Sequence, residues 1–360
     1  MSKHQVRGSR SATKWSDLRA AKDQMARRLI HEPRGQEAHR LLASRMVVPR
    51  TLALPVSTAP SENTVGVGIG EKISDGKQTG VLAVKFLVRM KFAKSDLKSD
   101  HLLPKEIDGI PTDVEEVGTF RRFASTGTAR GWAQAAAMPN PRTKFRPAQP
   151  GCSIGFQDPG NQFVMAGTFG ALVKDRAGLY VLSNNHVLAD ENRLAAGASI
   201  FQPGLLDGGN ASTDKIAALT KFVTLKAGSP NTVDCAIAEA SGQTVVSKDI
   251  LYIGPPQGTE AAAIDMAVHK FGRTTGYTVG QVTSIDTDVT VGYDLGNLTF
   301  TGQIIIVGNS GSFSNAGDSG SLILERGTNK AVGLLFAGST SHTIANHIDD
   351  VLKALGVTLA

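Results

Sequence analysis

From Gly151 to its end, the chain is a series of short apolar runs separated by Gly, Asp, Asn and Pro, and this pattern constrains the fold most strongly. Runs such as "GLYVLSNN", "VDCAIAEA" and "TFTGQIIIVG" have the length of strands and are bounded by turn residues. Many short strands with few helices predict a β-sandwich or a β-barrel. One helix is predicted to end the chain, in "IANHIDDVLKALGV", where apolar residues recur at helical spacing.

The region before Gly151 divides into three predicted parts. Residues 1–50 read as a basic helical arm, with Leu18, Met25 and Leu29 near helical spacing. Residues 51–123 read as a small α+β domain rich in strands, with the turn "SDGK" between two apolar runs. Residues 124–150 are rich in Ala, Pro and Gly and read as a linker, exposed enough that self-cleavage within it is a further hypothesis.

The charge of the chain is concentrated in the arm. Residues 1–50 carry twelve Lys and Arg against four Asp and Glu, so the local balance is +8 and the remaining 310 residues sum to −2. A solvated tail is the favoured interpretation, because the arm lacks a set of aromatic residues interleaved with its basic ones and has no recognisable nucleic-acid module. Contact with nucleic acid or an acidic partner is the minority interpretation, and the formation of a homo-oligomer is left open.

Long apolar runs, a secretory signal and cysteines are absent or few in this sequence, and this narrows the class of protein. There is no run of 18 apolar residues, which excludes a membrane-spanning helix, and the basic N-terminus lacks the apolar core of a secretory signal. The chain has two cysteines, a low number that favours a reducing compartment, and we expect a cytoplasmic protein. Cys235 reads as a small buried apolar residue. No cofactor or metal site is predicted.

The segment "NAGDSGSLIL" raises the possibility of a nucleophilic serine at Ser319. Gly-Asp-Ser-Gly is also ordinary turn chemistry, so the segment does not decide the matter by itself. A serine nucleophile needs a general base, a carboxylate that orients the base, and backbone N–H donors for the oxyanion. Gly317 gives the backbone the freedom to turn its N–H toward the same point as that of Ser319. Asp318 is either a turn residue or the anchor of this loop.

A base and a carboxylate are found upstream. His186 ends an apolar run at the polar turn "NNHVLA", where its side chain would face a cleft at the edge of a sheet. Asp234 begins the apolar run "DCAIAEA", where a buried carboxylate needs a partner. Taken alone, each residue has an equally good structural explanation, as a satisfied histidine or a turn aspartate.

The order of these motifs resembles a known family. "LSNNHVLA", "VDCAIA" and "GDSGSL" look like the His, Asp and Ser motifs of trypsin-like serine peptidases with the chymotrypsin fold. "KFGRTTGYTVGQV", "FQPGLLDGG" and the upstream "VGVGIGEKISDGKQTG" resemble a narrower intracellular bacterial group, to which plant narrow-leaf-type proteins are similar. The resemblance implies a mainly β double barrel with a C-terminal helix over residues 151–360, following the arm and the small N-terminal domain.

The resemblance also implies roles for individual residues. His186, Asp234 and Ser319 would form the triad in the cleft between the barrels, and the Gly317 and Ser319 N–H groups would bind the oxyanion. Substrate backbone would pair with the strand from Phe336 through Ala337 to Gly338.

Specificity is expected to depart from that of trypsin. Phe313 stands six residues before the nucleophile, where trypsins have an aspartate, and Leu335 stands where glutamate-specific members have a histidine. An apolar or small side chain at P1, the substrate residue before the cut bond, is the residual expectation. Activation by a freed N-terminal amine that pairs with Asp318 is not expected.

The sequence supports two main hypotheses. The first is an intracellular serine endopeptidase that hydrolyses protein or peptide substrates through an acyl-enzyme, with a regulatory N-terminal region. The second is a catalytically silent protein that binds peptides or acts as a scaffold on a protease fold.

Overall fold

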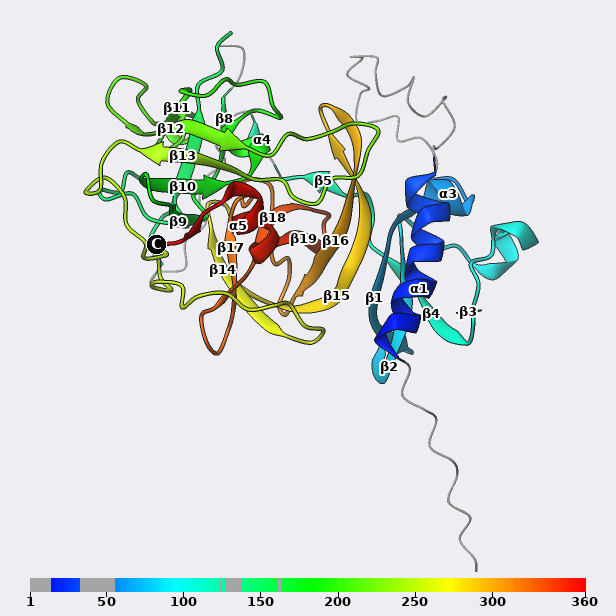
Figure 1. Cartoon of the computed structure of the whole chain (residues 1–360). Helices are drawn as coiled ribbons and strands as arrows, with labels where there is room; N and C mark the ends of the chain where they lie inside the picture. Colours follow the sequence, from blue (N-terminus) through cyan, green and yellow to red (C-terminus); the bar gives the residue numbers. More distant parts are fainter. Residues whose placement is uncertain (1–13, 33–55, 124, 127–137, 161–163) are drawn as a thin grey trace, which may run out of the picture.

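The computed structural model describes residues 14–32, 56–123, 125–126, 138–160 and 164–360. The predicted arm and the predicted linker therefore lie partly outside the described residues. The chain is mainly β, as predicted, and its strands form two large sheets (Figure 1).

One sheet contains a closed antiparallel barrel, called here the second barrel because its strands come later in the chain. Its strand order runs β14, β17, β18, β19, β16 and β15, and β15 pairs with β14 again, so the six strands leave no free edge. Val282, Ile304, Ile306 and Ile323 fill its interior, because alternate residues of each strand point inward. The strands are β14 (Ala267–Gly272), β15 (Gly276–Tyr293), β16 (Gly296–Gly308), β17 (Leu322–Glu325), β18 (Ala331–Gly338) and β19 (His342–His347).

The other sheet forms the first barrel, which closes through a bend in the chain. Its order is β20, β9, β10, β13, β12, β11, β7, β8 and β6. Strands β8 and β9 lie near opposite ends of this strand order, yet only Phe169 and Gly170 separate them in the chain. This short connection brings the two ends of the sheet together. The strands are β6 (Ser125–Thr126), β7 (Ser153–Phe156), β8 (Met165–Thr168), β9 (Ala171–Lys174), β10 (Leu179–Ser183), β11 (Ser199–Phe201), β12 (Lys215–Phe222), β13 (Ala236–Ala240) and β20 (Thr358–Leu359). The double-barrel prediction is confirmed.

The C-terminal helix α5 (Ile348–Leu355) is also confirmed. It buries Ile348, Val351, Leu352 and Leu355 against the largest apolar cluster, which extends over both barrels. Gly356 ends the helix in the left-handed conformation (φ 75°), which costs glycine little. The helix therefore ties the last residues, through β20, to the first barrel.

The N-terminal strands continue the sheet of the second barrel. The hairpin of β1 (Thr64–Ser74) and β2 (Lys77–Val88) turns at Asp75–Gly76, both with positive φ as the "SDGK" turn requires. β1 pairs with the long strand β15, and β2 pairs with β4 (Ile110–Glu116), which is followed outward by β3 (Glu106–Ile107). Figure 1 shows this unit beside β15 and β16.

Helix α1 (Trp15–Ala26) and the π-helical turn that follows it (Arg27–His31) pack on the N-terminal strands. Leu18, Met25 and Leu29 are buried against Val67 and Phe86. Short helical elements complete the chain: α3 (Pro60–Asn63), α4 (Asn185–Leu188) and three 3₁₀ turns (Lys94–Asp96, Ser99–His101 and Leu205–Asp207). The division of the chain at residues 50, 123 and 150 stays a prediction. No helix of the described residues is long and apolar enough to cross a membrane.

Candidate active site

The loop before β17 presents Ser319 between two glycines with positive φ, Gly317 (98°) and Gly320 (92°). Strand β8 of the other barrel holds this loop, since Thr168 N–H donates to Ser319 O (2.8 Å) and Thr168 Oγ1 donates to Gly317 O (3.0 Å). A side chain at residue 320 would meet Ser183 Oγ at 2.1 Å, so only glycine fits there. The candidate nucleophile is thus fixed where the two barrels meet.

Asp318, which belongs to the same loop, holds the loop in place through buried hydrogen bonds. Its buried carboxylate accepts hydrogen bonds from Thr274 N–H (2.8 Å), Thr275 Oγ1 (2.7 Å) and Asn315 N–H (2.9 Å). The Nζ of Lys270, also fully buried, lies 3.6 Å from Asp318 Oδ2. A lysine in the interior therefore faces this carboxylate, and burial lowers the pKa of that lysine although Asp318 opposes the shift.

His186 and Asp234 form a buried pair. The single turn of α4 follows β10 and carries His186, whose Nδ1 lies 2.5 Å from Asp234 Oδ2 just before β13. Asp234 Oδ1 also accepts the N–H groups of Asn185 (2.7 Å) and His186 (3.3 Å). The carboxylate thereby orients the imidazole so that the other ring nitrogen, Nε2, is directed away from it.

Tyr293 supplies a further contact that the sequence analysis missed. Its hydroxyl, at the end of β15, donates to Asp234 Oδ2 at 2.7 Å, and its ring meets the His186 ring edge-on. Burial and the nearby Asp234 carboxylate raise the pKa of Tyr293 well above its usual value, so the hydroxyl remains protonated and donates. A tyrosine at a strand end has no motif that marks this role, because the contact joins residues 59 positions apart.

The described residues leave His186 Nε2 without a hydrogen-bond partner, although this atom is buried. Ser319 Oγ donates instead to Phe336 O, at 3.1 Å. His186, Asp234 and Ser319 are 1%, 0% and 0% exposed, so the three predicted triad residues are all covered in this state.

The predicted substrate-binding residues lie around Ser319. Phe336, Ala337 and Gly338 are at the end of β18, and Phe313 is buried in the apolar interior of the second barrel. Gly317 N–H, one of the two predicted oxyanion donors, donates to the carbonyl of Phe123 at 2.8 Å. The chain thus brings a peptide carbonyl of its own to the predicted oxyanion site.

A comparison with protein families identifies this part of the chain. Residues 172–343, which include His186, Asp234 and Ser319, match the model of Peptidase family S64. The matched region is a trypsin-like serine peptidase. The broad class predicted from the sequence is confirmed, whereas the narrower resemblance to plant-type proteins has no support from the comparisons.

Solved structures similar to the peptidase share low identity with it. Protease A from Thermobifida fusca aligns with a TM-score of 0.42 and 19% identity, over 59% of this chain and 97% of its own. A glutamic-acid-specific serine protease, described as using a histidine triad in substrate binding, aligns with a TM-score of 0.40 and 21% identity over 59% and 100%. The α-lytic protease homolog N4 aligns with a TM-score of 0.43 and 17% identity over 59% and 98%. No curated protein matches the chain.

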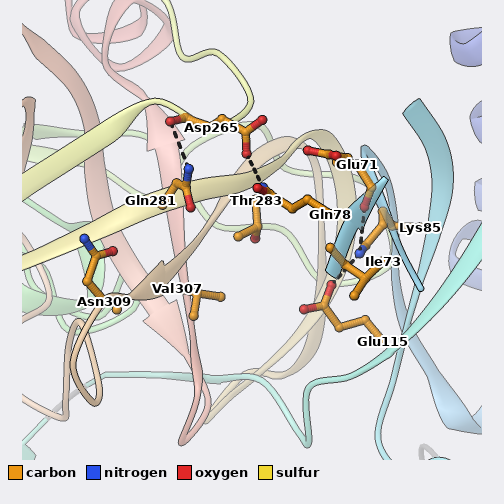
Figure 2. A pocket seen from close by; sticks show the side chains of 11 residues that line it. Glu71, Ile73, Gln78, Lys85, Glu115, Asp265, Gln281, Thr283, Val307 and Asn309 are labelled. Atoms are coloured by element: carbon orange, nitrogen blue, oxygen red, sulfur yellow. Dashed lines mark hydrogen bonds and ion pairs between the residues drawn. The ribbon is translucent and has the colours of Figure 1, made fainter. Parts of the chain in front are cut away.

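A cavity of about 440 Å³, whose lining includes none of the predicted triad residues, lies elsewhere in the molecule. Figure 2 shows the side chains that line it. It opens between the hairpin of β1 and β2 and the strands β15 and β16, and Lys85 and Gln78 are among the side chains that Figure 2 shows there. Three carboxylates, Glu71, Glu115 and Asp265, also line it. In the described part of the chain no group of three or more His, Cys, Asp or Glu side chains is arranged to hold a metal ion.

Proposed function

We propose that the protein is a serine endopeptidase that hydrolyses peptide bonds through His186, Asp234 and Ser319. The observation that supports this most is the buried His186–Asp234 pair, whose Nε2 has no hydrogen-bond partner among the described residues. A histidine with one nitrogen held by a carboxylate and the other free is arranged to accept a proton from a hydroxyl. Ser319 lies on a loop that Thr168 of strand β8 holds by two hydrogen bonds, and β8 belongs to the barrel that carries His186 and Asp234.

The proposed reaction has two stages. Ser319 Oγ attacks the substrate carbonyl while His186 Nε2 takes the hydroxyl proton, and the N–H groups of Gly317 and Ser319 stabilise the oxyanion. His186 then gives the proton to the leaving amine, which forms an acyl-enzyme that water hydrolyses. Asp234, held also by Tyr293, keeps the imidazole in place and stabilises its charged form.

Covalent labelling tests this proposal. A fluorophosphonate probe is expected to modify Ser319 in the wild type, and Ser319→Ala is expected to abolish the modification. Ser312→Ala is the matched control, because Ser312 precedes Ser319 in the same loop region. In the described part of the chain, the Ser312 hydroxyl donates one hydrogen bond, to the carbonyl of Thr340. Labelling that survives Ser319→Ala, or that never occurs in folded protein, would contradict the proposal.

A silent peptide-binding or scaffold protein is the second candidate. The covered triad and the bond from Ser319 Oγ to Phe336 O favour it, because neither is the arrangement of a reacting serine. Casein digestion separates the two candidates. Digestion that disappears in His186→Ala supports the endopeptidase, and folded protein without any digestion or labelling supports the scaffold.

A cytoplasmic location and a regulatory role for the N-terminal region are further parts of the proposal. The regulatory role is supported by the sheet that joins β1 to β15, because β15 also ends at Tyr293.

A further inference from the structure

A short stretch of the chain crosses the candidate active site. Strand β5 (Arg121–Arg122) pairs in antiparallel orientation with β18, Arg122 opposite Ala337 and Arg121 opposite Gly338. These are the residues predicted to bind the backbone of a substrate. In Figure 1, β5 lies apart from β1, β2 and β4, near the strands of the barrels.

The next residue, Phe123, completes a set of main-chain contacts around Ser319. Its N–H donates to Phe336 O (3.3 Å), and its carbonyl oxygen accepts from Gly317 N–H (2.8 Å). Phe336 O also accepts the Ser319 hydroxyl. The carbonyl of Phe123 is therefore bound to one of the two N–H groups predicted to stabilise the oxyanion of a substrate.

The side chain of Phe123 fills an apolar pocket. It is 8% exposed and belongs to the cluster that includes Phe313, Val282 and Ile306 inside the second barrel. A Cβ at Gly338 would lie 2.5 Å from Cζ of this ring, so glycine at that position leaves room for it. The pocket thus accepts a large aromatic side chain, and Phe313 forms part of its wall where trypsins place an aspartate.

Arg122, the residue before Phe123, contacts a buried negative charge. The Arg122 guanidinium forms an ion pair with Glu191, which is 1% exposed, and donates to Asp294 Oδ2 at 2.6 Å. Burial raises the pKa of Glu191, and Arg122 opposes that shift. Since an unpaired buried carboxylate is costly, this position of the cleft favours a basic side chain.

The chain continues onto the other barrel. Strand β6 pairs in antiparallel orientation with β8, Ser125 opposite Ala166 and Thr126 opposite Met165. Residues on the two sides of Phe123 are therefore paired with different barrels, as a substrate spanning the cleft between them would be.

We infer that Arg121, Arg122 and Phe123 bind in the cleft as an internal substrate, and that the peptidase cuts its own chain at the peptide bond that follows Phe123. This inference rests on the proposed function. It also commits the enzyme to an aromatic or large apolar residue at P1 and a basic residue before it. The hypothesis of self-cleavage within residues 124–150 thereby moves to the bond at the start of that segment.

The reaction consumes one water. Ser319 Oγ turns from Phe336 O to His186, loses its proton to Nε2 and bonds to the Phe123 carbonyl carbon. The C–N bond to Ala124, the next residue in the sequence, breaks as His186 protonates the new amine. Water, deprotonated by His186, then hydrolyses the ester and leaves a Phe123 carboxylate and a free Ser319 hydroxyl. The two fragments remain joined through the pairing of β1 with β15.

Intact-mass measurement of the full chain tests the inference. The wild type is expected to give fragments 1–123 and 124–360, whose masses sum to the uncut chain plus one water, and Ser319→Ala is expected to stay whole. Fragments that end at any other bond overturn the inference, as does a wild type that stays whole while the probe labels its Ser319. In that last case the endopeptidase proposal survives and the stretch is only an inhibitor; absence of both labelling and cleavage removes both proposals.

Substitutions within the stretch give a sharper test. Phe123→Leu is expected to be cut within about fivefold of the wild-type rate, and Phe123→Asp to be cut at least about 100-fold more slowly, because a carboxylate is expelled from an apolar pocket. Arg122→Glu is expected to slow the cut about 10- to 100-fold, since it removes charge-assisted hydrogen bonds to Glu191 and Asp294. Arg121→Glu is the matched control, because Arg121 is exposed, and it should leave the rate nearly unchanged. Equal effects of the two arginine substitutions would contradict the assigned subsite.

A peptide supplies a readout that does not depend on folding of these variants. The sequence of residues 120–127, FRRFASTG, is offered to the full-length Phe123→Gly protein, whose own stretch lacks the aromatic anchor. Cleavage after the second Phe is expected, and no cleavage of the same peptide with Asp at that position. Cleavage after either arginine would overturn the assigned specificity.

Discussion

The ion pair between Lys270 and Asp318 is predicted to hold the loop that carries Ser319 in place. Both side chains are fully buried, and their charged atoms lie 3.6 Å apart. At an effective dielectric constant of about 20, the attraction over this distance is about 4–5 kcal/mol. Part of it offsets the desolvation of the two charges, so the net value of the pair is smaller.

Asp318 and Lys270 differ in the number of hydrogen bonds that each keeps when its partner is removed. Asp318 keeps hydrogen bonds from Thr274, Thr275 and Asn315 if the lysine is lost. Lys270 keeps only Thr275 Oγ1 and Gly276 O among its described hydrogen bonds if the carboxylate is lost. Each single substitution leaves a buried charge without its partner, and Lys270 then keeps fewer hydrogen bonds than Asp318 does. We therefore expect Lys270→Met to lower the free energy of unfolding by about 2–3 kcal/mol and Asp318→Ala by about 3–5 kcal/mol.

Urea unfolding of the two variants and of the double variant measures the coupling. We expect the double variant to be about 2 kcal/mol more stable than the sum of the single losses predicts, since residues in contact are not additive. The labelling rate of Ser319 should fall further in Asp318→Ala than in Lys270→Met, because Asp318 also binds Asn315 within the loop. A coupling energy below about 0.5 kcal/mol would refute the reasoning.

Three other substitutions or conditions have defined outcomes. Tyr293→Phe removes a donor to Asp234 and should lower the Ser319 labelling rate about tenfold, by loss of a buried hydrogen bond to a charged group; an unchanged rate would exclude a positioning role. Gly338→Val should block the aromatic pocket and suppress self-cleavage by at least about 100-fold, and it should also lower the free energy of unfolding by about 1–3 kcal/mol, because its Cβ would meet both the Phe123 ring (2.5 Å) and the carbonyl oxygen of His342 (2.4 Å). His342 and Lys85 lower the pKa of Glu115 to about 2 against the burial that raises it, so about 3 kcal/mol of stability is present at neutral pH and is lost as the pH falls from about 4.5 to about 2. Unfolding measured across that window should lose this dependence in Glu115→Gln.

Much of the fold was readable because it depends on local pattern. The strands from β7 onward alternate with turn residues, and the "SDGK" turn is formed by residues that accept positive φ. Helix α5 was readable from apolar spacing alone. Cys235, expected to be a small buried residue, is buried in the first barrel.

What the sequence did not indicate depends on pairing between distant segments. The sheet from β1 to β15 joins residues more than 200 positions apart, and no local pattern specifies that register. The dipeptide Arg121–Arg122 has no strand pattern and becomes a strand only because β18 and β15 present open backbone groups to it. The sequence therefore predicts only that this pocket is apolar, on the basis of Phe313.

The triad positions were proposed from motifs, and the structure adds their setting. The sequence placed His186 at the end of a strand and Asp234 at the start of an apolar run, and the two side chains are hydrogen-bonded. Their relation to Ser319 depends on the packing of two barrels, which motif order suggests but does not measure.

Peptide mapping after fluorophosphonate treatment tests the central claim most directly. The Phe123→Gly protein, in which the cleft has lost its internal aromatic anchor, is compared with the same protein carrying His186→Ala. We expect one modified residue, Ser319, and a labelling rate at least about 1,000-fold slower without the histidine, as expected when a general base is removed from a serine nucleophile. Modification of another residue, or an unchanged rate at Ser319 without His186, would contradict the account.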